Sequence, residues 1–210
     1  MFDYQSIIDT LIKGDQAQLT EMVKEALNQE VAAEEILNSG LIAGMDIVGE
    51  KMENEEMFIP EVLRSAKVMG AALEILRPQL REDTKTSQGK VVIGTVKGDL
   101  HDIGKNLVAM MLESSGLEVY NLGVDVAPED FVTAVKEKNA QLLGLSALLT
   151  TTMPMMKNTV EAVTESGIRN QVKIVIGGAP VTKKFADDIG ADGYAPDAGA
   201  AVKLAKTLLQ

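Results

Sequence analysis

Five short apolar segments, each followed by a stretch with helical spacing, fill residues 91–210. The apolar segments are 91–96, 118–123, 142–148, 173–178 and 192–195. Strands that are buried on both faces of a sheet have this continuous apolar character, and parallel strands need a long crossover, usually a helix, to connect them. The alternation therefore predicts an α/β domain with a doubly wound, five-stranded parallel sheet.

Residues 1–80 have a different periodicity, in which apolar side chains recur three and four positions apart. Four such segments with short connections predict a four-helix bundle, and Pro60 suits the first turn of the fourth helix. The polar stretch at 81–90 follows Pro78 and is expected to be a linker. The predicted organisation is a helical domain at 1–80, a linker at 81–90 and a parallel α/β domain at 91–210.

The composition argues against several classes of function. The chain has 31 acidic and 20 basic residues and a formal net charge of -11, which argues against nucleic acid or an anionic membrane as a partner. It has no cysteine, which excludes a disulfide framework, a thiolate nucleophile and a cysteine-based zinc or iron–sulfur site. The N-terminus lacks the pattern of a signal peptide, and no uninterrupted apolar segment is long enough to span a membrane. We therefore expect a soluble cytoplasmic protein.

Small and polar residues follow every predicted strand. His101, the one histidine of the chain, comes after the first strand together with Gly98, Asp99 and Gly104. In an open parallel sheet, ligands bind at the carboxyl ends of the strands, where such residues gather. The residues in or after the later strands include Asp125, Ser146, Thr150, Thr151, Thr152, Gly177, Gly178, Tyr194 and Asp197.

Each of these features also has an ordinary structural interpretation. A single histidine is often only a hydrogen-bonded or surface residue, the threonine run at 150–152 could cap a helix, and the paired glycines could form a tight turn. Asp99, His101 and Asp102 offer one imidazole and two carboxylates to a metal, but zinc sites usually have more nitrogen or sulfur ligands. The residues alone leave these alternatives open.

Three motifs together resemble those of cobalamin-binding proteins. The segment "VKGDLHDIGKN" at 96–106 is similar to their Asp-x-His-x-x-Gly signature, and "SALLT" at 146–150 and "GG" at 177–178 follow in the same order. Upstream, "GLIAGMDIVGEKMENEEMFIPEVLRSAKVMGAALEILRP" resembles the four-helix cap module of methionine synthase and of methyltransferase corrinoid proteins. The resemblance covers nearly the whole chain.

This resemblance implies a cobalamin cofactor, carried as methylcobalamin or cob(I)alamin. It implies that His101 is the lower axial ligand of cobalt, that Asp99 is its hydrogen-bonding partner, and that the Thr152 hydroxyl completes a proton relay. It also implies a slot lined by small residues for the nucleotide tail of the cofactor, and an apolar cover for the upper face of the corrinoid, which carries the methyl group. The implied cofactor-binding residues are Gly98, Asp99, His101, Asp102, Ile103, Gly104, Ser146, Leu148, Thr150, Thr152, Gly177, Gly178, Tyr194 and Ala198, with Met57 and Phe58 from the cap.

The implied function is that of a corrinoid methyl carrier, a component of a cobalamin-dependent methyltransferase system rather than a complete enzyme. The implied partners are a substrate-specific methyltransferase, a methyltransferase that passes the methyl group to tetrahydrofolate or a thiol, and a reductive activase. Two alternatives remain, the small subunit of an adenosylcobalamin-dependent mutase and a cobalamin sensor. The sequence does not identify the methyl donor, which in similar systems is methanol, a methylamine, a betaine or a methoxylated aromatic compound.

Overall fold

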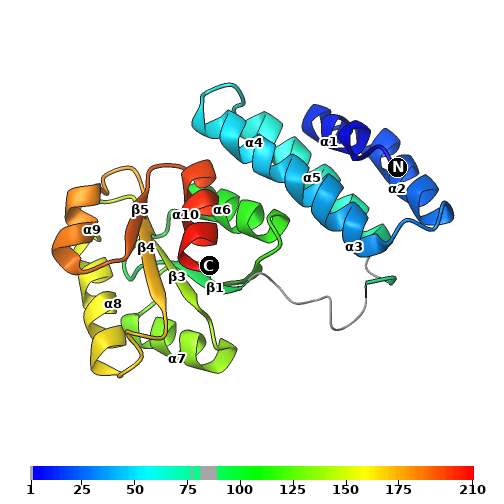
Figure 1. The fold of residues 1–210 in the computed structure, drawn as a ribbon. Helices are drawn as coiled ribbons and strands as arrows, with labels where there is room; N and C mark the ends of the chain where they lie inside the picture. Colours follow the sequence, from blue (N-terminus) through cyan, green and yellow to red (C-terminus); the bar gives the residue numbers. More distant parts are fainter. Residues whose placement is uncertain (1, 77, 81–88) are drawn as a thin grey trace. The chain divides into compact units, whose positions relative to one another are not determined.

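The computed structural model describes residues 2–76, 78–80 and 89–210, which form two compact units (Figure 1). One unit contains the helical N-terminal part together with residues 114–116, and the other contains the remaining residues from 89 onward. The linker predicted at 81–90 falls largely on 81–88, which lie outside the described residues.

The helical unit is built from helices that follow one another with short connections. Their bounds are α1 Tyr4–Lys13, α2 Gln16–Asn28, α3 Ala33–Glu35, the π-helix η1 Ile36–Ile42, α4 Ala43–Glu53 and α5 Ile59–Leu76. Because α3, η1 and α4 are continuous in sequence, they form the predicted third helix, with a π-helical middle part. The prediction of a helical N-terminal part is confirmed.

Two glycines let η1 and α4 pack close to α1. A Cβ atom on Gly40 would lie 2.9 Å from Ile7 Cγ2, and one on Gly44 would lie 3.3 Å from Leu11 Cδ2. Ile7 and Leu11 are fully buried, so these contacts belong to the core of the helical unit. Larger residues at either glycine would push the helices apart in a closely packed interior.

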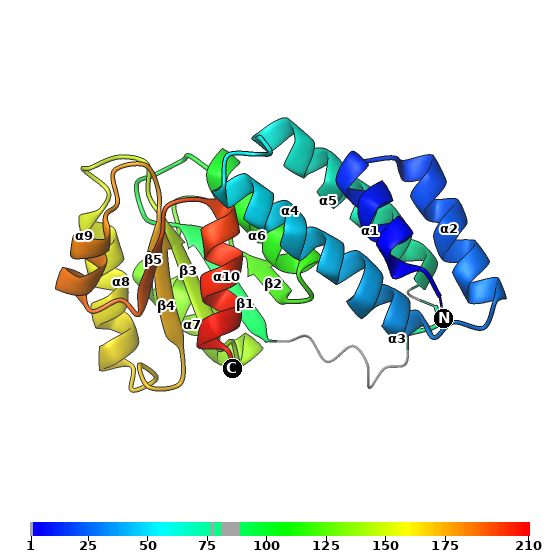
Figure 2. The same cartoon turned by 45° about the horizontal axis from the view of Figure 1, so that its top comes forward.

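The α/β unit contains a five-stranded, all-parallel sheet with the order β2-β1-β3-β4-β5. The strands are β1 Lys90–Thr95, β2 Glu118–Asn121, β3 Leu142–Ser146, β4 Lys173–Gly177 and β5 Gly193–Ala195. The helices are α6 Ile103–Ser114, α7 Pro128–Lys138, α8 Pro154–Glu165, α9 Lys183–Ile189 and α10 Ala198–Leu208. Figures 1 and 2 show α6 and α10 on one face of the sheet and α7 and α8 on the other. The predicted doubly wound parallel sheet is confirmed.

Apolar side chains fill the space between the sheet and its helices. Val92, Leu143 and Ile174 from three neighbouring strands are fully buried, together with Phe131 of α7. Because helices cover both faces of the sheet, consecutive residues of a strand are buried, which explains why the strand sequences are continuously apolar. Within the described ranges, no helix is both long and apolar enough to cross a membrane.

Candidate functional site

The loops that follow β1 and β3 meet at the carboxyl edge of the sheet. The two strands are neighbours, but β1 leads into α6 on one face and β3 leads into α8 on the other. Such a switch point is where open parallel sheets bind ligands. The loop after β1 carries Asp99 and His101, and the loop after β3 carries Leu148, Leu149 and Thr152.

The Asp99 carboxylate joins these two loops. Its Oδ1 atom accepts hydrogen bonds from His101 Nδ1 at 2.7 Å and from the His101 backbone N–H at 3.1 Å. Its Oδ2 atom accepts from the backbone N–H groups of Leu148 and Leu149 at 2.8 and 3.2 Å, and from Thr152 Oγ1 at 2.7 Å. Since Asp99 is fully buried, these donors rather than water stabilise its charge.

The hydrogen bonds also determine the protonation state of this carboxyl group. Burial by itself raises the pKa of Asp99, because a charge is costly away from water. The hydrogen bonds from Thr152 and His101 and from the backbone N–H groups outweigh burial and hold this pKa well below its usual range. Asp99 is therefore an anion at neutral pH and accepts hydrogen bonds at both oxygens.

His101 presents one oriented nitrogen ligand. Because Asp99 accepts the proton on Nδ1, the neutral ring has its lone pair on Nε2. The side chain is 50% exposed, so an external ligand can reach the ring. In the part of the chain that the structure describes, no three His, Cys, Asp or Glu side chains are grouped to hold a metal ion.

Thr152 extends the chain of hydrogen bonds beyond Asp99. Its buried hydroxyl lies 2.7 Å from Asp99 Oδ2 and 2.8 Å from the Leu149 carbonyl oxygen. The structure therefore brings together His101, Asp99 and Thr152 in the order that the sequence predicted. The role of this chain as a proton relay stays a prediction.

Small residues line the ends of four strands beside this cluster. The register across β1, β3, β4 and β5 aligns Thr95, Ser146, Gly177 and Ala195. Gly178 follows β4 with a φ of +129°, and a Cβ atom there would lie 1.9 Å from the Ala147 carbonyl oxygen. Only glycine fits this conformation and this close approach. None of these strand-end residues has a bulky side chain, so the strand ends leave room for a narrow ligand.

Large apolar side chains of the two loops are open to solvent. Leu100 and Ile103 of the first loop are 71% and 83% exposed, and Leu148 and Leu149 of the second are 43% and 41% exposed. Exposed apolar side chains grouped around a polar ligand atom are typical of a binding surface. Ile103 and Leu148 are among the cofactor-binding residues that the resemblance implies, whereas Leu100 and Leu149 are not. The signal for these two leucines is their apolar character in loops that also carry polar residues.

The other predicted residues of the α/β unit also lie at or near this edge. The Gly98 N–H donates to Asp125 Oδ1 at 2.7 Å, and Asp102 Oδ2 accepts from Asn106 Nδ2 at 2.9 Å. Gly104 has open space where a Cβ atom would be. Thr150 is exposed, Tyr194 is half-buried in β5, and Ala198 is buried at the first residue of α10. Their contacts with a cofactor stay predictions.

The predicted cap residues belong to the helical unit. Met57 is buried, whereas Phe58, just before α5, is 64% exposed, with exposed Ile59 beside it. Their predicted place over the cofactor stays a prediction.

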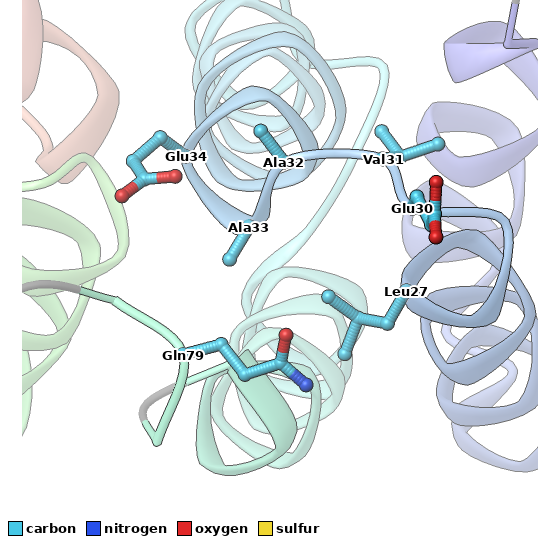
Figure 3. A pocket seen from close by; sticks show the side chains of 7 residues that line it. All are labelled: Leu27, Glu30, Val31, Ala32, Ala33, Glu34 and Gln79. Atoms are coloured by element: carbon cyan, nitrogen blue, oxygen red, sulfur yellow. The ribbon is translucent and has the colours of Figure 1, made fainter.

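The helical unit contains a hollow of about 590 Å³ (Figure 3). It is lined by Leu27, Glu30, Val31, Ala32, Ala33, Glu34 and Gln79. None of these residues belongs to the predicted site.

Two family profiles match this chain, and both are described as a B12 binding domain. One covers residues 89–203 and the other covers residues 4–77. The chain is 42% identical over 203 residues to dimethylamine corrinoid protein 3 of Methanosarcina acetivorans, covering 97% of this chain and 95% of that protein.

Solved structures agree with this match. The chain resembles a cobalamin-binding protein from Desulfitobacterium hafniense DCB-2 with a TM-score of 0.85, 34% identity and 99% coverage of both chains. It also resembles the methanol:cobalamin methyltransferase complex of Methanosarcina barkeri with a TM-score of 0.85 and 29% identity, covering 97% of this chain and 78% of that one. Together with the parallel sheet, these matches define a cobalamin-binding protein. The chain belongs to the B12-binding family and, within it, to the corrinoid proteins.

Proposed function

We propose that the protein is a corrinoid methyl carrier that binds the cobalt of cobalamin through His101. The observation that carries the proposal is the hydrogen bond from His101 Nδ1 to Asp99, since it leaves the Nε2 lone pair free on a half-exposed ring. Membership of the corrinoid proteins supports the same conclusion.

The residues at the sheet edge fit this cofactor. When bound, the corrinoid supplies the cobalt centre at which a methyl group is accepted and released. Asp99 would keep the imidazole in the ligating tautomer, and Thr152 would support the charge on Asp99. The row of small residues with Gly178 would admit the nucleotide tail, while the exposed leucines of the two loops would cover apolar parts of the corrin.

The site also explains why a carrier needs partner proteins. Asp99 is buried and its oxygens are occupied by donors, and the Nδ1 proton of His101 is held by Asp99. With Nε2 bound to cobalt as well, neither group would be free to act as an acid or base on a substrate. Activation of the methyl donor and of the acceptor is therefore the task of the partners.

We infer that the methyl donor is a methylated amine and that the first partner is a methyltransferase specific for it. The identity of 42% to a dimethylamine corrinoid protein over nearly the full length supports this inference, against 29% to the structure of the methanol complex. A second methyltransferase for a folate or thiol acceptor, a reductive activase and a cytoplasmic location stay predictions.

Reconstitution of the full chain tests the carrier function. We expect the protein to bind methylcobalamin in preference to adenosylcobalamin when both are offered in the dark. A preference for adenosylcobalamin would contradict the carrier function and favour the mutase subunit.

The donor is tested separately with purified methyltransferases. Protein loaded with cob(I)alamin should accept a methyl group from a dimethylamine-specific methyltransferase faster than from a methanol-specific one. Transfer from the methanol enzyme alone would contradict the amine donor and leave the carrier function intact.

A further inference from the structure

A buried lysine lies in the first turn of α6, close in sequence to the histidine motif. Lys105 is buried, and its ammonium donates a hydrogen bond to Asn121 Oδ1 at 2.7 Å. It forms no ion pair with a carboxylate of residues 2–76, 78–80 or 89–210. Burial lowers the pKa of this ammonium, and the nearby Asp102 carboxylate offsets part of that effect. A buried cation held by a neutral amide is a poor source of stability, which points to another role.

The lysine begins a chain of hydrogen bonds that ends beside His101. Asn121 is the last residue of β2, and its Nδ2 donates to Asn106 Oδ1 at 3.0 Å. Asn106 Nδ2 in turn donates to Asp102 Oδ2 at 2.9 Å. An ammonium can only donate, so it dictates the orientation of both amides, and every bond runs from the cation towards the carboxylate. Asp102, the residue after His101, is thereby connected by hydrogen bonds to the end of β2.

The same asparagine also holds the loop between β2 and α7. Asn121 Oδ1 accepts from the Gly123 N–H at 3.0 Å, and the Gly123 carbonyl oxygen accepts from the Thr95 N–H at 3.0 Å. Two residues further on, the Asp125 N–H donates to the Asp99 carbonyl oxygen at 3.0 Å.

Asp125, in a strained backbone conformation, connects the β2–α7 loop to the loop after β1. Its φ is +55°, a left-handed value that is uncommon outside glycine, and its carboxylate accepts from the Gly98 N–H at 2.7 Å. Such a conformation persists only where the surroundings determine it. The β2–α7 loop therefore forms a second wall that supports Gly98 and Asp99 from the side opposite to β3.

We infer that Lys105, with Asn121 and Asn106, positions the loop at 98–102 so that His101 can bind cobalt. This inference rests on the proposed function. These three residues act through the loop and are positioning residues. They fix both flanks of the loop before the cofactor arrives, which lowers the entropic cost of ligation.

The test uses the full chain labelled with ¹⁵N-histidine and reconstituted with cob(II)alamin. Because the chain has one histidine, electron paramagnetic resonance reports His101 ligation as a ¹⁵N doublet on the cobalt lines. We expect Lys105→Met to lower the ratio of histidine-bound to histidine-free cofactor about tenfold, the scale of one hydrogen bond from a charged donor. Its midpoint in urea should stay unchanged or rise, since the variant removes a buried charge.

Two further variants complete the experiment. Lys157→Met removes an exposed α8 lysine that pairs with Glu161, and it should change neither ligation nor stability. Asn106→Ala removes the hydrogen bonds to Asp102 and Asn121 but keeps Lys105, and its helical position tolerates alanine, so it should lower the ligation ratio in a folded protein.

The outcomes separate this inference from the proposed function. If the unmodified protein shows no ¹⁵N doublet, the axial role of His101 is wrong and the positioning role is wrong with it. If the unmodified protein shows the doublet and both Lys105→Met and Asn106→Ala keep its full intensity, only the positioning role is overturned. If Lys105→Met does not fold, the intensity in Asn106→Ala decides.

Discussion

Replacing Asp99 by asparagine removes the charge at the centre of the site while keeping its shape. The carboxylate accepts three hydrogen bonds at Oδ2 and two at Oδ1, whereas an amide offers one oxygen and one donating NH2 group. In one orientation the NH2 group faces Leu148 and Leu149 and leaves their two N–H donors without an acceptor, at about 1–3 kcal/mol each. In the other orientation it faces His101.

We expect the orientation that faces His101, because it leaves only one backbone donor unsatisfied. The NH2 group then donates to Nδ1, so the ring proton moves to Nε2 and the cobalt-binding lone pair is lost. The free energy of unfolding should fall by about 1–3 kcal/mol, and His101 ligation should fall at least about tenfold.

Urea unfolding measures the free energy of unfolding. Electron paramagnetic resonance spectra of the ¹⁵N-histidine protein with cob(II)alamin measure His101 ligation. Asp188→Asn, at an exposed residue of α9, is the matched control and should change neither quantity. An Asp99→Asn protein with full histidine ligation and unchanged stability would refute the tautomer argument.

Three further substitutions test separate parts of the site. Gly178→Ala places a Cβ atom 1.9 Å from the Ala147 carbonyl oxygen at a φ of +129°. It should therefore lower the free energy of unfolding by more than about 1 kcal/mol and weaken cobalamin binding in a titration. Gly104→Ala has open space around the new Cβ atom and should do neither. Thr152→Val keeps the shape but removes the hydroxyl from the buried carboxylate and should cost about 1–3 kcal/mol in urea unfolding, while Thr152→Ser should cost less; equal losses would contradict the role of the hydroxyl. Phe58→Ala changes a 64% exposed side chain, so stability should stay within about 0.5 kcal/mol while methylcobalamin photolysis becomes faster; an unchanged photolysis rate would remove Phe58 from the cap.

Much of the fold was predictable because its signals are local. Each strand is a continuous apolar run, since both faces of the sheet are covered, and each intervening helix has its own spacing. The position of His101 after the first strand also followed from the sequence. What periodicity did not show is the π-helical winding of η1, which depends on how that segment packs.

The candidate site was predictable in its residue types and, through the family resemblance, in the order His101, Asp99 and Thr152, but not in its backbone contacts. The sequence placed Asp99 beside His101, but not the backbone N–H groups of Leu148 and Leu149 that share the same carboxylate. Backbone donors carry no sequence signal, and these come from a loop about 50 residues away. Lys105 was equally hidden, because a lysine in an amphipathic helix is ordinarily expected to reach water.

By itself, the sequence determined the alternation of strands and helices, the motif that carries the histidine, and the glycines that permit close approach. The tertiary structure decided the strand order that brings the β1 and β3 loops together, the burial of Asp99, and the resulting tautomer of His101. The physical reason is that hydrogen bonds and burial depend on distances between segments far apart in the chain, which exist only after the sheet has formed.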